Sequence, residues 1–397
     1  MKSIKNVSFK GKKVLLRVDF NVPVDEKGRI TDDTRMKEAM PTIEKLLSDD
    51  ASIIIMAHFG RPKKGGFEPE FSLEPVAKHL SEMLNKQIIF SNELDLDKIA
   101  ETASKMKERD VMLLENIRFY PQETKGDVSF AKKLSSLGDA YINDAFGAAH
   151  REHVSTATIA QFFPNDKYFG FLMENELINL QKLINNPKKP FTAIIGGSKV
   201  SSKIDILNNL SLIADNIIIG GAMAYTFLKA LGFSIGNSLF EEDNLTTAKE
   251  IIENLKKNNT KLFLPIDHII ADKFDNNAKI EKTENENIPN GFMGMDIGEK
   301  TIELFDRVIL SSKTILWNGP VGVFEMSSFA NGTYSIAKCI ANATKQGAFS
   351  AVGGGDSVSA IHHSGYSNDI SYISTGGGAM LEYLEGKTLP GVKAIEE

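Results

Sequence analysis

The sequence predicts an α/β protein whose two halves each contain a parallel sheet with helices on both faces. Short apolar runs recur along the chain without polar alternation, as is typical of strands that are buried on both faces. Stretches with helical apolar spacing separate these runs, and strands that alternate with helices form parallel sheets through crossover connections. The segment NNPKKP at 185–190 interrupts the pattern, so we place a domain junction there.

The first half contains four apolar runs that end in polar residues. We expect strands at 13–19, 52–57, 111–114 and 140–143. We expect helices at 41–47, with Pro41 in the first turn, and at 73–84, and helical spacing also at 168–184. The strands lead into the polar clusters FNVP, HFGRP, ENIRF and DAFGAAHREH. Ligands of parallel sheets bind beyond the carboxyl ends of the strands, where these clusters lie.

The second half repeats the pattern with glycine-rich strand ends. We expect strands at 191–195, 216–219, 261–264, 314–317 and 348–352. They lead into GGSKVSSK, GGAMAYTF, PIDH, NGPVGVFE and GGGDS. The single cysteine, Cys339, lies in a helical-looking stretch with no histidine nearby, so we interpret it as a buried structural thiol, and a disulfide within the chain is impossible.

Two glycine triplets, Gly353–Gly355 and Gly376–Gly378, are the features that most favour a nucleotide site. The first ends a strand and the second starts a helix. Glycine lets a phosphate approach bare backbone N–H groups, and a helix start adds a positive dipole end. Asp356, directly after the first triplet, is a natural ligand for the Mg²⁺ that accompanies phosphates. The alternative interpretation is that the triplets are flexible turns, but this would explain a single triplet better than it explains two.

Composition limits the class of protein. The chain has 397 residues, enough for two or three domains, with 42% hydrophobic and 25% charged residues. The net charge of −6 argues against general nucleic-acid binding. No apolar run has the length of a membrane span or of a signal peptide core, so we expect no membrane partner and a cytoplasmic location.

Arginine and glycine are divided unevenly between the halves. Seven of the eight arginines precede residue 152, and 22 of the 31 glycines follow residue 185. Guanidinium groups grip carboxylates and phosphates, so we expect a small anion on the first half and a nucleotide on the second. The polar strand ends of the first half carry Asp19, Asn21, Arg35, His58, Phe59, Gly60, Arg61, Arg118, His150 and Arg151. Singly these arginines would be solvated charges, but together they favour a pocket for a ligand with a phosphate and a carboxylate.

Three further residues of the second half invite a functional interpretation. Lys199 and Lys203 are four apart and would share one face of a helix that began near Ser198. A lysine charge is unfavourable next to the positive dipole end at a helix start. An anion bound between the two lysines is therefore favoured. Glu325 is either a helix N-terminal acid or an acceptor for ribose hydroxyls.

The spacing of His150 and His153 suggests a metal, but no HExxH pattern or thiolate supports zinc.

The motifs taken together resemble one enzyme family. RVDFNVP, HFGRP, ENIRF, DAFGAAHREH, GGSKVSSKI, GFMGMDIG, WNGPVGVFE, AVGGGDS, STGGGA and LPGV are similar to phosphoglycerate kinase, over essentially the whole chain and in the family's order. The chain departs from the family at Ser198, where alanine is usual, at Ser357, where threonine is usual, and at Phe292, where tryptophan is usual. None of these departures removes a charge that the chemistry needs.

The resemblance implies a monomeric, cytoplasmic glycolytic kinase with two Rossmann-like domains that face each other across a cleft. It implies reversible transfer of the acyl phosphate of 1,3-bisphosphoglycerate to MgADP, by direct in-line transfer on hinge closure. We expect a substrate domain at 1–170, an interdomain helix and hinge at 171–190, a nucleotide domain at 191–380, and a segment at 381–397 that returns to the first domain.

The resemblance also implies roles for individual residues. Arg35 and Lys199 resemble the pair that stabilises the transferring phosphoryl group, and Asp356 the ligand of Mg²⁺. The glycerate substrate would be held by Asp19, Asn21, Arg35, His58, Phe59, Gly60, Arg61, Arg118 and Arg151. The nucleotide would be held by Gly197, Lys203, Gly220, Gly221, Gly294, Met295, Val323, Glu325, Gly354, Gly355, Asp356 and Ser357.

Two other functions fit the sequence less well. A dinucleotide-dependent oxidoreductase requires GxGxxG after a strand, and the sequence has none. A nucleotide-binding regulator of the same fold that has lost its activity would be expected to have lost Arg35, Lys199 or Asp356, and all three are present.

Overall fold

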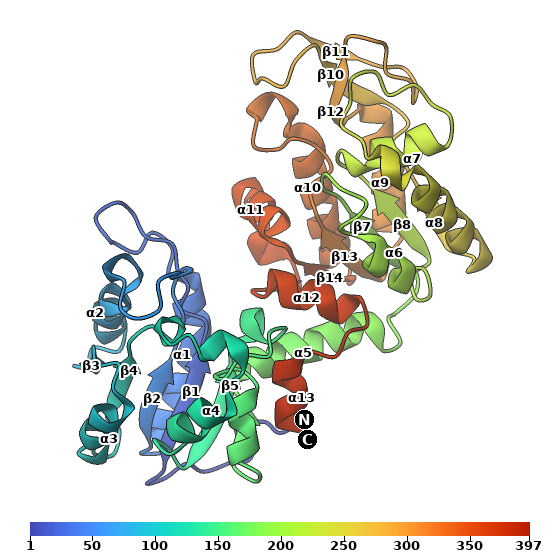
Figure 1. Ribbon diagram of the computed structural model, residues 1–397. Coiled ribbons are helices and arrows are strands. Elements are labelled where there is room, and N and C mark those ends of the chain that lie inside the picture. Colours follow the sequence, from blue (N-terminus) through green and yellow to red (C-terminus); the bar gives the residue numbers. More distant parts are fainter. The chain divides into compact units, whose positions relative to one another are not determined.

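A computed structural model describes all 397 residues, which divide into two compact units. The first unit comprises residues 1–178 and 388–397, and the second comprises residues 179–387 (Figure 1). Each unit contains a six-stranded sheet in which every neighbouring pair of strands is parallel. The predicted fold class, two Rossmann-like domains, is confirmed.

The sheet of the first unit has the strand order β3-β4-β2-β1-β5-β6. Its strands are β1 (Lys13–Val18), β2 (Ser52–Met56), β3 (Ile89–Ser91), β4 (Val111–Leu114), β5 (Ala140–Asp144) and β6 (Lys167–Phe169). The chain builds the sheet outward from β1 in one direction and then returns to add β5 on the other side. This change of direction between β1 and β5 is where parallel sheets usually hold their ligands.

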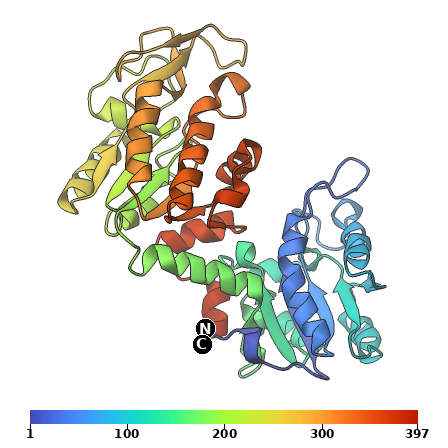
Figure 2. The ribbon, with the colours of Figure 1, turned by 180° about the vertical axis from the view of Figure 1, so that it is seen from behind.

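Helices cover both faces of this sheet. They are α1 (Thr34–Ser48), α2 (Glu74–Met83), α3 (Leu96–Ser104), α4 (Val128–Ser135), α5 (Phe171–Ile184) and α13 (Pro390–Glu396). Val14 and Leu16 of β1 join one buried cluster with Ile43 of α1 and Leu80 of α2. Helix α4 lies in front of the sheet in Figure 1, and α1 lies in front of it in the reverse view of Figure 2. Because side chains alternate between the two faces along a strand, the side chain of Arg17, the residue after Leu16, points to the face opposite α1.

The helix predicted at 41–47 is longer than expected, and Pro41 lies inside it rather than at its start. The side chain of Asp32 accepts hydrogen bonds from the backbone and hydroxyl of Thr34, which supports an earlier start. An internal proline costs a helix about 3 kcal/mol. The burial of Met36, Ile43 and other apolar residues on one side of α1 compensates for this cost.

The sheet of the second unit has the order β15-β14-β13-β7-β8-β9. Its strands are β7 (Phe191–Ile195), β8 (Asn216–Ile219), β9 (Lys261–Phe263), β13 (Thr314–Asn318), β14 (Phe349–Val352) and β15 (Tyr372–Ile373). The chain changes direction across the sheet between β7 and β13. The helices are α6 (Ile204–Leu210), α7 (Met223–Ala230), α8 (Leu245–Lys257), α9 (Glu299–Leu310), α10 (Asn331–Lys345), α11 (Gly355–Ser364) and α12 (Gly377–Leu384). Cys339 is buried in α10, as predicted.

A small antiparallel sheet in the second unit was not predicted. It has the order β11-β10-β12 and consists of β10 (His268–Ala271), β11 (Ile280–Lys282) and β12 (Met293–Ile297). Strand β11 is short and fully exposed, so no run of buried residues marks it in the sequence. None of the helices is both long and apolar enough to cross a membrane.

Candidate active site

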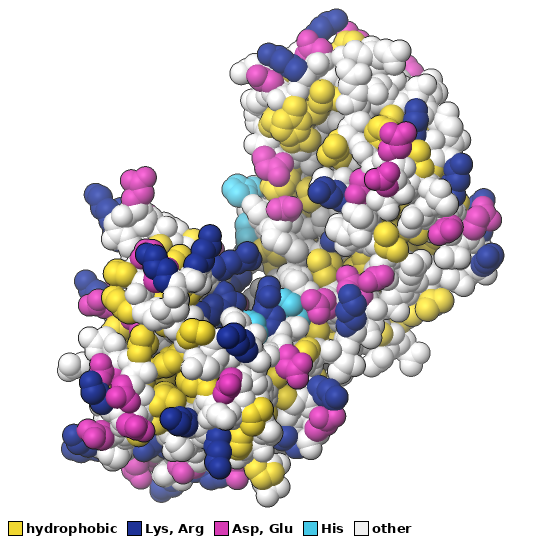
Figure 3. Space-filling model, viewed as in Figure 1, with side chains coloured by type: hydrophobic (Ala, Val, Ile, Leu, Met, Phe, Trp, Pro, Cys, Tyr) yellow, Lys and Arg dark blue, Asp and Glu magenta, His cyan; other side chains and the backbone are white.

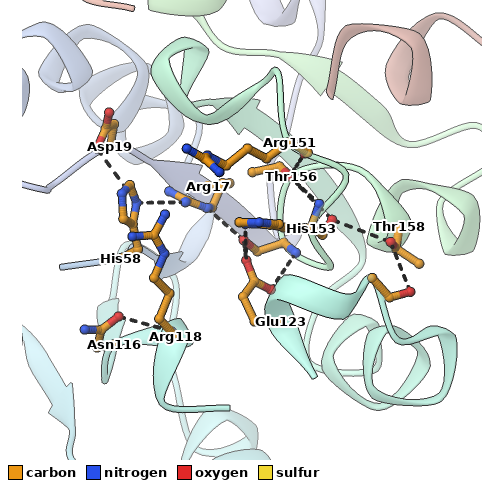
Figure 4. Close-up of polar contacts among 12 residues, drawn as sticks. Arg17, Asp19, His58, Asn116, Arg118, Glu123, Arg151, His153, Thr156 and Thr158 are labelled. Carbon is orange, nitrogen blue, oxygen red and sulfur yellow. Dashed lines mark hydrogen bonds and ion pairs between the residues drawn. The ribbon is translucent and has the colours of Figure 1, made fainter. Parts of the chain in front are cut away.

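Cationic side chains gather at the carboxyl ends of the first sheet. Figure 3 shows lysine and arginine side chains concentrated on this part of the first unit's surface. Figure 4 shows the buried part of the cluster, in which Arg17 lies between His58 and Glu123. The residues come from the ends of β1, β2 and β5 and from the loop after β4, so the parallel topology brings them together.

Arg17, the penultimate residue of β1, is 1% exposed. Its Nη2 lies 3.1 Å from Nδ1 of His58, and its Nε donates to Oγ of Ser155 at 2.8 Å. A third donor, Nη1, bonds to the carbonyl oxygen of Val18. Arg17 therefore fixes the position of the His58 ring. It was not predicted as a site residue, because in the sequence it looks like an ordinary strand residue.

Glu123 supplies the negative charge beneath this cluster. Its carboxylate is 1% exposed and accepts hydrogen bonds from the backbone N–H of Ser155 at 2.9 Å and from the Ser155 hydroxyl at 2.6 Å. Oε1 also lies 4.0 Å from Nδ1 of His153. Ser155 thus connects Glu123 to Arg17, and this buried link fixes the loop after β5. No sequence motif points to Glu123, because its partners come from distant parts of the chain.

Burial, followed by the charges of neighbouring arginines, lowers the pKa of three groups in the cluster. Burial, followed by the charges of Arg17, Arg118 and Arg35, holds the pKa of His58 well below its usual range. Burial and the neighbouring arginines lower the pKa of His153 to about 4 and that of Arg118 to about 10. Like charges gathered in this way are unfavourable without an anion, so the arrangement is that of an anion-binding site.

The outer residues of the cluster form a second layer of contacts. Nη1 of Arg35 donates to Oδ2 of Asp19 at 3.1 Å and to the carbonyl oxygen of Asn21 at 3.2 Å. Oδ1 of Asn21 accepts from the N–H of Gly60 at 2.8 Å, and Nη1 of Arg118 donates to the Gly60 carbonyl oxygen at 2.7 Å. These predicted substrate residues therefore share one hydrogen-bonded network.

The remaining predicted substrate residues differ in exposure. Phe59 is buried and exchanges backbone hydrogen bonds with the side chain of Asn116, which holds the turn after β2. Arg61 and Arg151 are exposed. They lie at the ends of the turns after β2 and β5, with their guanidinium groups available to a ligand. Their contacts with a substrate stay a prediction.

In the second unit, the turn after β13 is the point where the predicted nucleotide loops meet. The Gly196 N–H donates to the Asn318 carbonyl oxygen at 2.9 Å, and the Gly197 N–H to that of Pro320 at 3.2 Å. The Gly221 N–H donates to the Val321 carbonyl oxygen at 3.0 Å. The loops after β7, β8 and β13 are thus joined at the change of strand direction.

The two glycine triplets lie side by side, as the predicted phosphate site requires. A Cβ added to Gly377 would lie 3.5 Å from Cα of Gly354, whereas one added to Gly355 would meet nothing within 4 Å. Gly354 has a φ of +91°, and a Cβ there would lie 2.6 Å from Nδ2 of Asn318. Glycine is required at Gly354 by backbone conformation and packing, and the backbone at Gly355 is open to a ligand.

The charged residues beside the triplets are arranged differently from the prediction. Helix α6 begins at Ile204, so Lys199 and Lys203 do not share a helical face; both precede the helix, in turns. Nζ of Lys203 donates to Oδ1 of Asn318 at 2.7 Å. Burial lowers the pKa of Lys203, while the carboxylates of Glu385 and Asp356 raise it. Lys199 and Asp356 are exposed.

The predicted adenine and ribose residues occupy β12 and the turn after β13. The N–H of Val323 donates to the carbonyl oxygen of Met295 at 2.8 Å, which joins the two segments. Met295 is 2% exposed, and Glu325 is exposed. A Cβ on Gly294 would lie 2.0 Å from the hydroxyl oxygen of Tyr225, so the backbone there packs against the tyrosine.

Ser357 is placed differently from an open phosphate ligand. Its side chain is buried, and its Oγ accepts a hydrogen bond from the N–H of Gly319 at 2.5 Å. Ser357 therefore connects the start of α11 to the turn after β13. Asn318, which bonds to Lys203 and also donates to the Gly353 carbonyl oxygen at 2.7 Å, was not among the predicted site residues.

Comparison with known proteins gives one family. The family model described as phosphoglycerate kinase matches residues 4–387. A phosphoglycerate kinase of Chlorobium phaeobacteroides is 48% identical over 396 residues, covering 100% of this chain and 99% of the relative, and one of Clostridium botulinum is 49% identical over 400 residues, covering 100% and 98%. The solved phosphoglycerate kinase of Coxiella burnetii superposes with a TM-score of 0.91 at 39% identity, covering 99% of this chain and 98% of that one.

Proposed function

Since the chain belongs to the phosphoglycerate kinase family, we propose that it catalyses reversible transfer of the acyl phosphate of 1,3-bisphosphoglycerate to MgADP. The products are 3-phosphoglycerate and MgATP, and the role is glycolytic. The observation that carries this proposal is the cluster at the change of strand direction in the first unit, in which the buried Arg17 and the half-buried Arg118 lie close to the neutral ring of His58. A phosphorylated glycerate, with a phosphate and a carboxyl group, matches that charge.

The first unit would hold the glycerate ligand. Arg35, Arg61 and Arg151 expose guanidinium surface at the strand ends, and Arg118 is half-buried beside them. Guanidinium groups bind carboxylates and phosphates in a bidentate manner, which fixes the ligand's orientation as well as its charge. His58 would add a neutral N–H donor, because Arg17 already occupies its Nδ1.

The second unit would hold the nucleotide. The loops joined at the turn after β13 place Gly197, Gly221 and Val323 around one region of the sheet edge. Gly294 and Met295 would form an adenine wall, and Glu325 would accept from the ribose hydroxyls. Lys203 and the open N–H groups near Gly355 would contact the phosphates.

Asp356 fits the role of the Mg²⁺ ligand. It is an exposed carboxylate in the first turn of α11, and its charge raises the pKa of Lys203, so it lies on the same side as the proposed phosphate site. The chain contains no group of three or more histidine, cysteine, aspartate or glutamate residues that could hold a metal ion without other ligands. A single carboxylate is sufficient when phosphate oxygens and water complete the shell. The metal, when bound, neutralises phosphate charge.

Arg35 and Lys199 would act on the transferring group itself. Phosphoryl transfer depends on positioning the in-line oxygens and on stabilising charge on the equatorial oxygens. The leaving group of an acyl phosphate is a carboxylate, so no protein base is required. Arg35 belongs to the first unit and Lys199 to the second, which means that both units must contribute to one transition state.

We therefore propose that a hinge closure brings the two ligands together. The chain passes between the units within α5 and again between residues 387 and 388, since 388–397 belong to the first unit. These are the segments that would flex. Each unit has its own sheet and core, so each can move as a body. Membership of the family supports a monomer that works in the cytoplasm.

A coupled assay for ATP formation tests the proposed function. The purified protein, given ADP, Mg²⁺ and enzymatically generated 1,3-bisphosphoglycerate, should form ATP, and the Arg35→Met variant should not do so at a comparable rate. Nucleotide binding without ATP formation would instead support a regulator of the same fold, and the proposal would be wrong.

A further inference from the structure

Asp296 is a buried carboxylate in the second unit for which neither the reaction nor the predicted ligands give a role. It lies in β12, directly after Met295, and is 2% exposed. Oδ2 accepts from the N–H of Gly332 in the first turn of α10 at 2.7 Å. Oδ1 accepts from the N–H of Ile297 at 2.9 Å. One carboxylate therefore bonds to the backbone of its own strand and to that of the start of α10.

Two glycines show how closely this carboxylate is enclosed. A Cβ added to Gly322 would lie 2.1 Å from Oδ1 of Asp296, and one added to Gly332 would lie 2.2 Å from it. Gly322 belongs to the turn after β13, and Gly332 to α10. The carboxylate consequently fills the space where β12, this turn and α10 meet.

The charge of Asp296 is not balanced by a cation. Burial raises the pKa of this carboxyl to about 7, opposed only by the backbone hydrogen bonds from Gly332 and Ile297. A buried carboxylate without a counter-charge reduces stability. Such a group at the junction of three segments suggests a purpose other than stabilising the fold.

The turn that Asp296 supports is the one that carries the predicted nucleotide residues. Val323 donates its N–H to the Met295 carbonyl oxygen at 2.8 Å, and the N–H of Val321 donates to Oγ1 of Thr333 in α10 at 3.3 Å. Both bonds flank the Asp296 carboxylate. A change in its position would shift Val323 relative to Met295, and with it the width of the proposed adenine pocket.

We propose that Asp296 is a positioning residue for nucleotide binding, which sets the spacing between β12 and the turn after β13 through the start of α10. This inference rests on the proposed nucleotide role of the second unit. Asp296 touches no ligand in this account. It acts through Met295 and Val323, so its loss should weaken nucleotide affinity and leave glycerate affinity unchanged.

Asp267 in the same unit provides a matched control. It is 5% exposed and accepts hydrogen bonds from the N–H groups of Lys300 at 3.0 Å and Thr301 at 2.8 Å in the first turn of α9. A Cβ on Gly298 would lie 2.3 Å from its carboxyl carbon and Oδ2. Asp267 thus resembles Asp296, because it accepts hydrogen bonds at a helix start and packs against a glycine. Its bonds go to α9, however, and the glycine that it packs against does not belong to the turn after β13, as Gly322 does for Asp296.

The experiment compares Asp296→Asn and Asp267→Asn with the wild type in full-length protein. Calorimetric titration would give the Kd for MgADP and, separately, for 3-phosphoglycerate. Asp296→Asn should raise the Kd for MgADP about tenfold, because a displaced turn after β13 would place Val323 less well against the nucleotide. Its Kd for 3-phosphoglycerate, and its kcat at saturating MgADP, should stay within about twofold, because distant sites behave independently. Asp267→Asn should lower the melting temperature but leave both Kd values within about twofold.

A second variant protects the test against misfolding. Gly322→Ala keeps the carboxyl group but puts a methyl group 2.1 Å from the present position of Oδ1, so the carboxylate and the turn must move apart, and the variant should show the same selective loss of MgADP affinity. Equal Kd values for MgADP in the wild type, Asp296→Asn and Gly322→Ala would overturn the inference while the proposed function stands. A parallel loss of affinity in Asp267→Asn would also overturn it, by showing a general effect of stability. A wild type that binds no MgADP would overturn the proposed function, and the inference with it.

Discussion

Nη2 of Arg17 lies 3.1 Å from Nδ1 of His58, and this contact determines the protonation of the histidine ring. A guanidinium group donates hydrogen bonds and accepts none, so Nδ1 must be the acceptor. The ring proton therefore resides on Nε2, and His58 is neutral. The low pKa of His58, caused by burial and then by the charge of Arg17, agrees with this assignment.

The first prediction is that His58 stays in the neutral Nε2–H form from about pH 5.5 to 8, the range in which an ordinary histidine titrates. Long-range ¹H–¹⁵N NMR spectra of the ring nitrogens would show it, with the signal assigned by the His58→Gln variant. A ring that titrates near pH 6.5, or that carries its proton on Nδ1, would show that the contact with Arg17 has been assigned wrongly.

The second prediction concerns Arg35 and Lys199, which lie in different units. Each should act mainly in the transition state, so Arg35→Met and Lys199→Ala should lower kcat by roughly 10²–10³-fold while KM changes much less. Steady-state kinetics with both substrates varied would measure this. Lys249→Ala, which removes another exposed lysine of the second unit, is the control and should have wild-type kinetics. A Lys199→Ala enzyme with a raised KM and an intact kcat would make Lys199 a binding residue instead.

The third prediction concerns the metal. Asp356→Asn should keep the fold and weaken MgADP about tenfold or more, with little effect on 3-phosphoglycerate, because the amide replaces a charged oxygen ligand. Titration calorimetry with each ligand would show the difference. Asp205→Asn is the matched control, since Asp205 is also an exposed aspartate in the first turn of a helix of the same unit. Equal losses for both ligands, or none, would count against the assignment.

The fourth prediction concerns Asp144, which is fully buried at the end of β5 and accepts from the N–H of Met173 in the first turn of α5 at 3.0 Å. Burial raises its pKa from 3.8 to about 7. A raised folded-state pKa stabilises the protein at low pH, and this contribution is lost as pH rises from the unfolded value to about 7.

Asp144→Asn should remove that dependence. Relative to the wild type, the variant should gain about 2 kcal/mol of stability between pH 5.5 and pH 7, and nothing more above it, at about 1.4 kcal/mol per pH unit. Chemical unfolding at a series of pH values would measure the difference. Asp97→Asn, at an exposed helix start in the same unit, is the control. A difference between Asp144→Asn and the wild type that is constant with pH would contradict the prediction.

The parallel sheets could be predicted because their strands are short buried runs. Val111–Leu114 and Phe191–Ile195 have the predicted bounds, since burial on both faces leaves a continuous apolar signal. Helix boundaries were less accurate. Pro41 suggested a start, but the hydrogen bonds from Thr34 to the Asp32 side chain and the apolar face of α1 favour an earlier one. The expected helix near Ser198 is a series of bends and turns, and the two glycines directly before it, Gly196 and Gly197, are bonded to the turn after β13.

Residues of the candidate site that directly follow a strand could be predicted. Residues that only hold the site residues in position could not. Asp19, His58 and Gly355 stand beside glycines or at strand ends, where ligand-binding residues are expected. Arg17, Glu123 and Asp296 act through partners that are distant in sequence or through packing against glycines. Such partners exist only in the folded chain, so a single sequence carries no signal for them.

In the proposed reaction, two units that each hold one ligand must close for direct transfer. Reacting atoms have to approach to about 3–3.5 Å, and each ligand alone contacts one unit, so neither should favour closure by itself. Small-angle X-ray scattering would be measured on the free protein, with 3-phosphoglycerate, with MgATP, and with both at saturation under turnover. The account predicts a smaller radius of gyration only with both ligands. An unchanged radius with both ligands, in protein shown to be turning over, would contradict it.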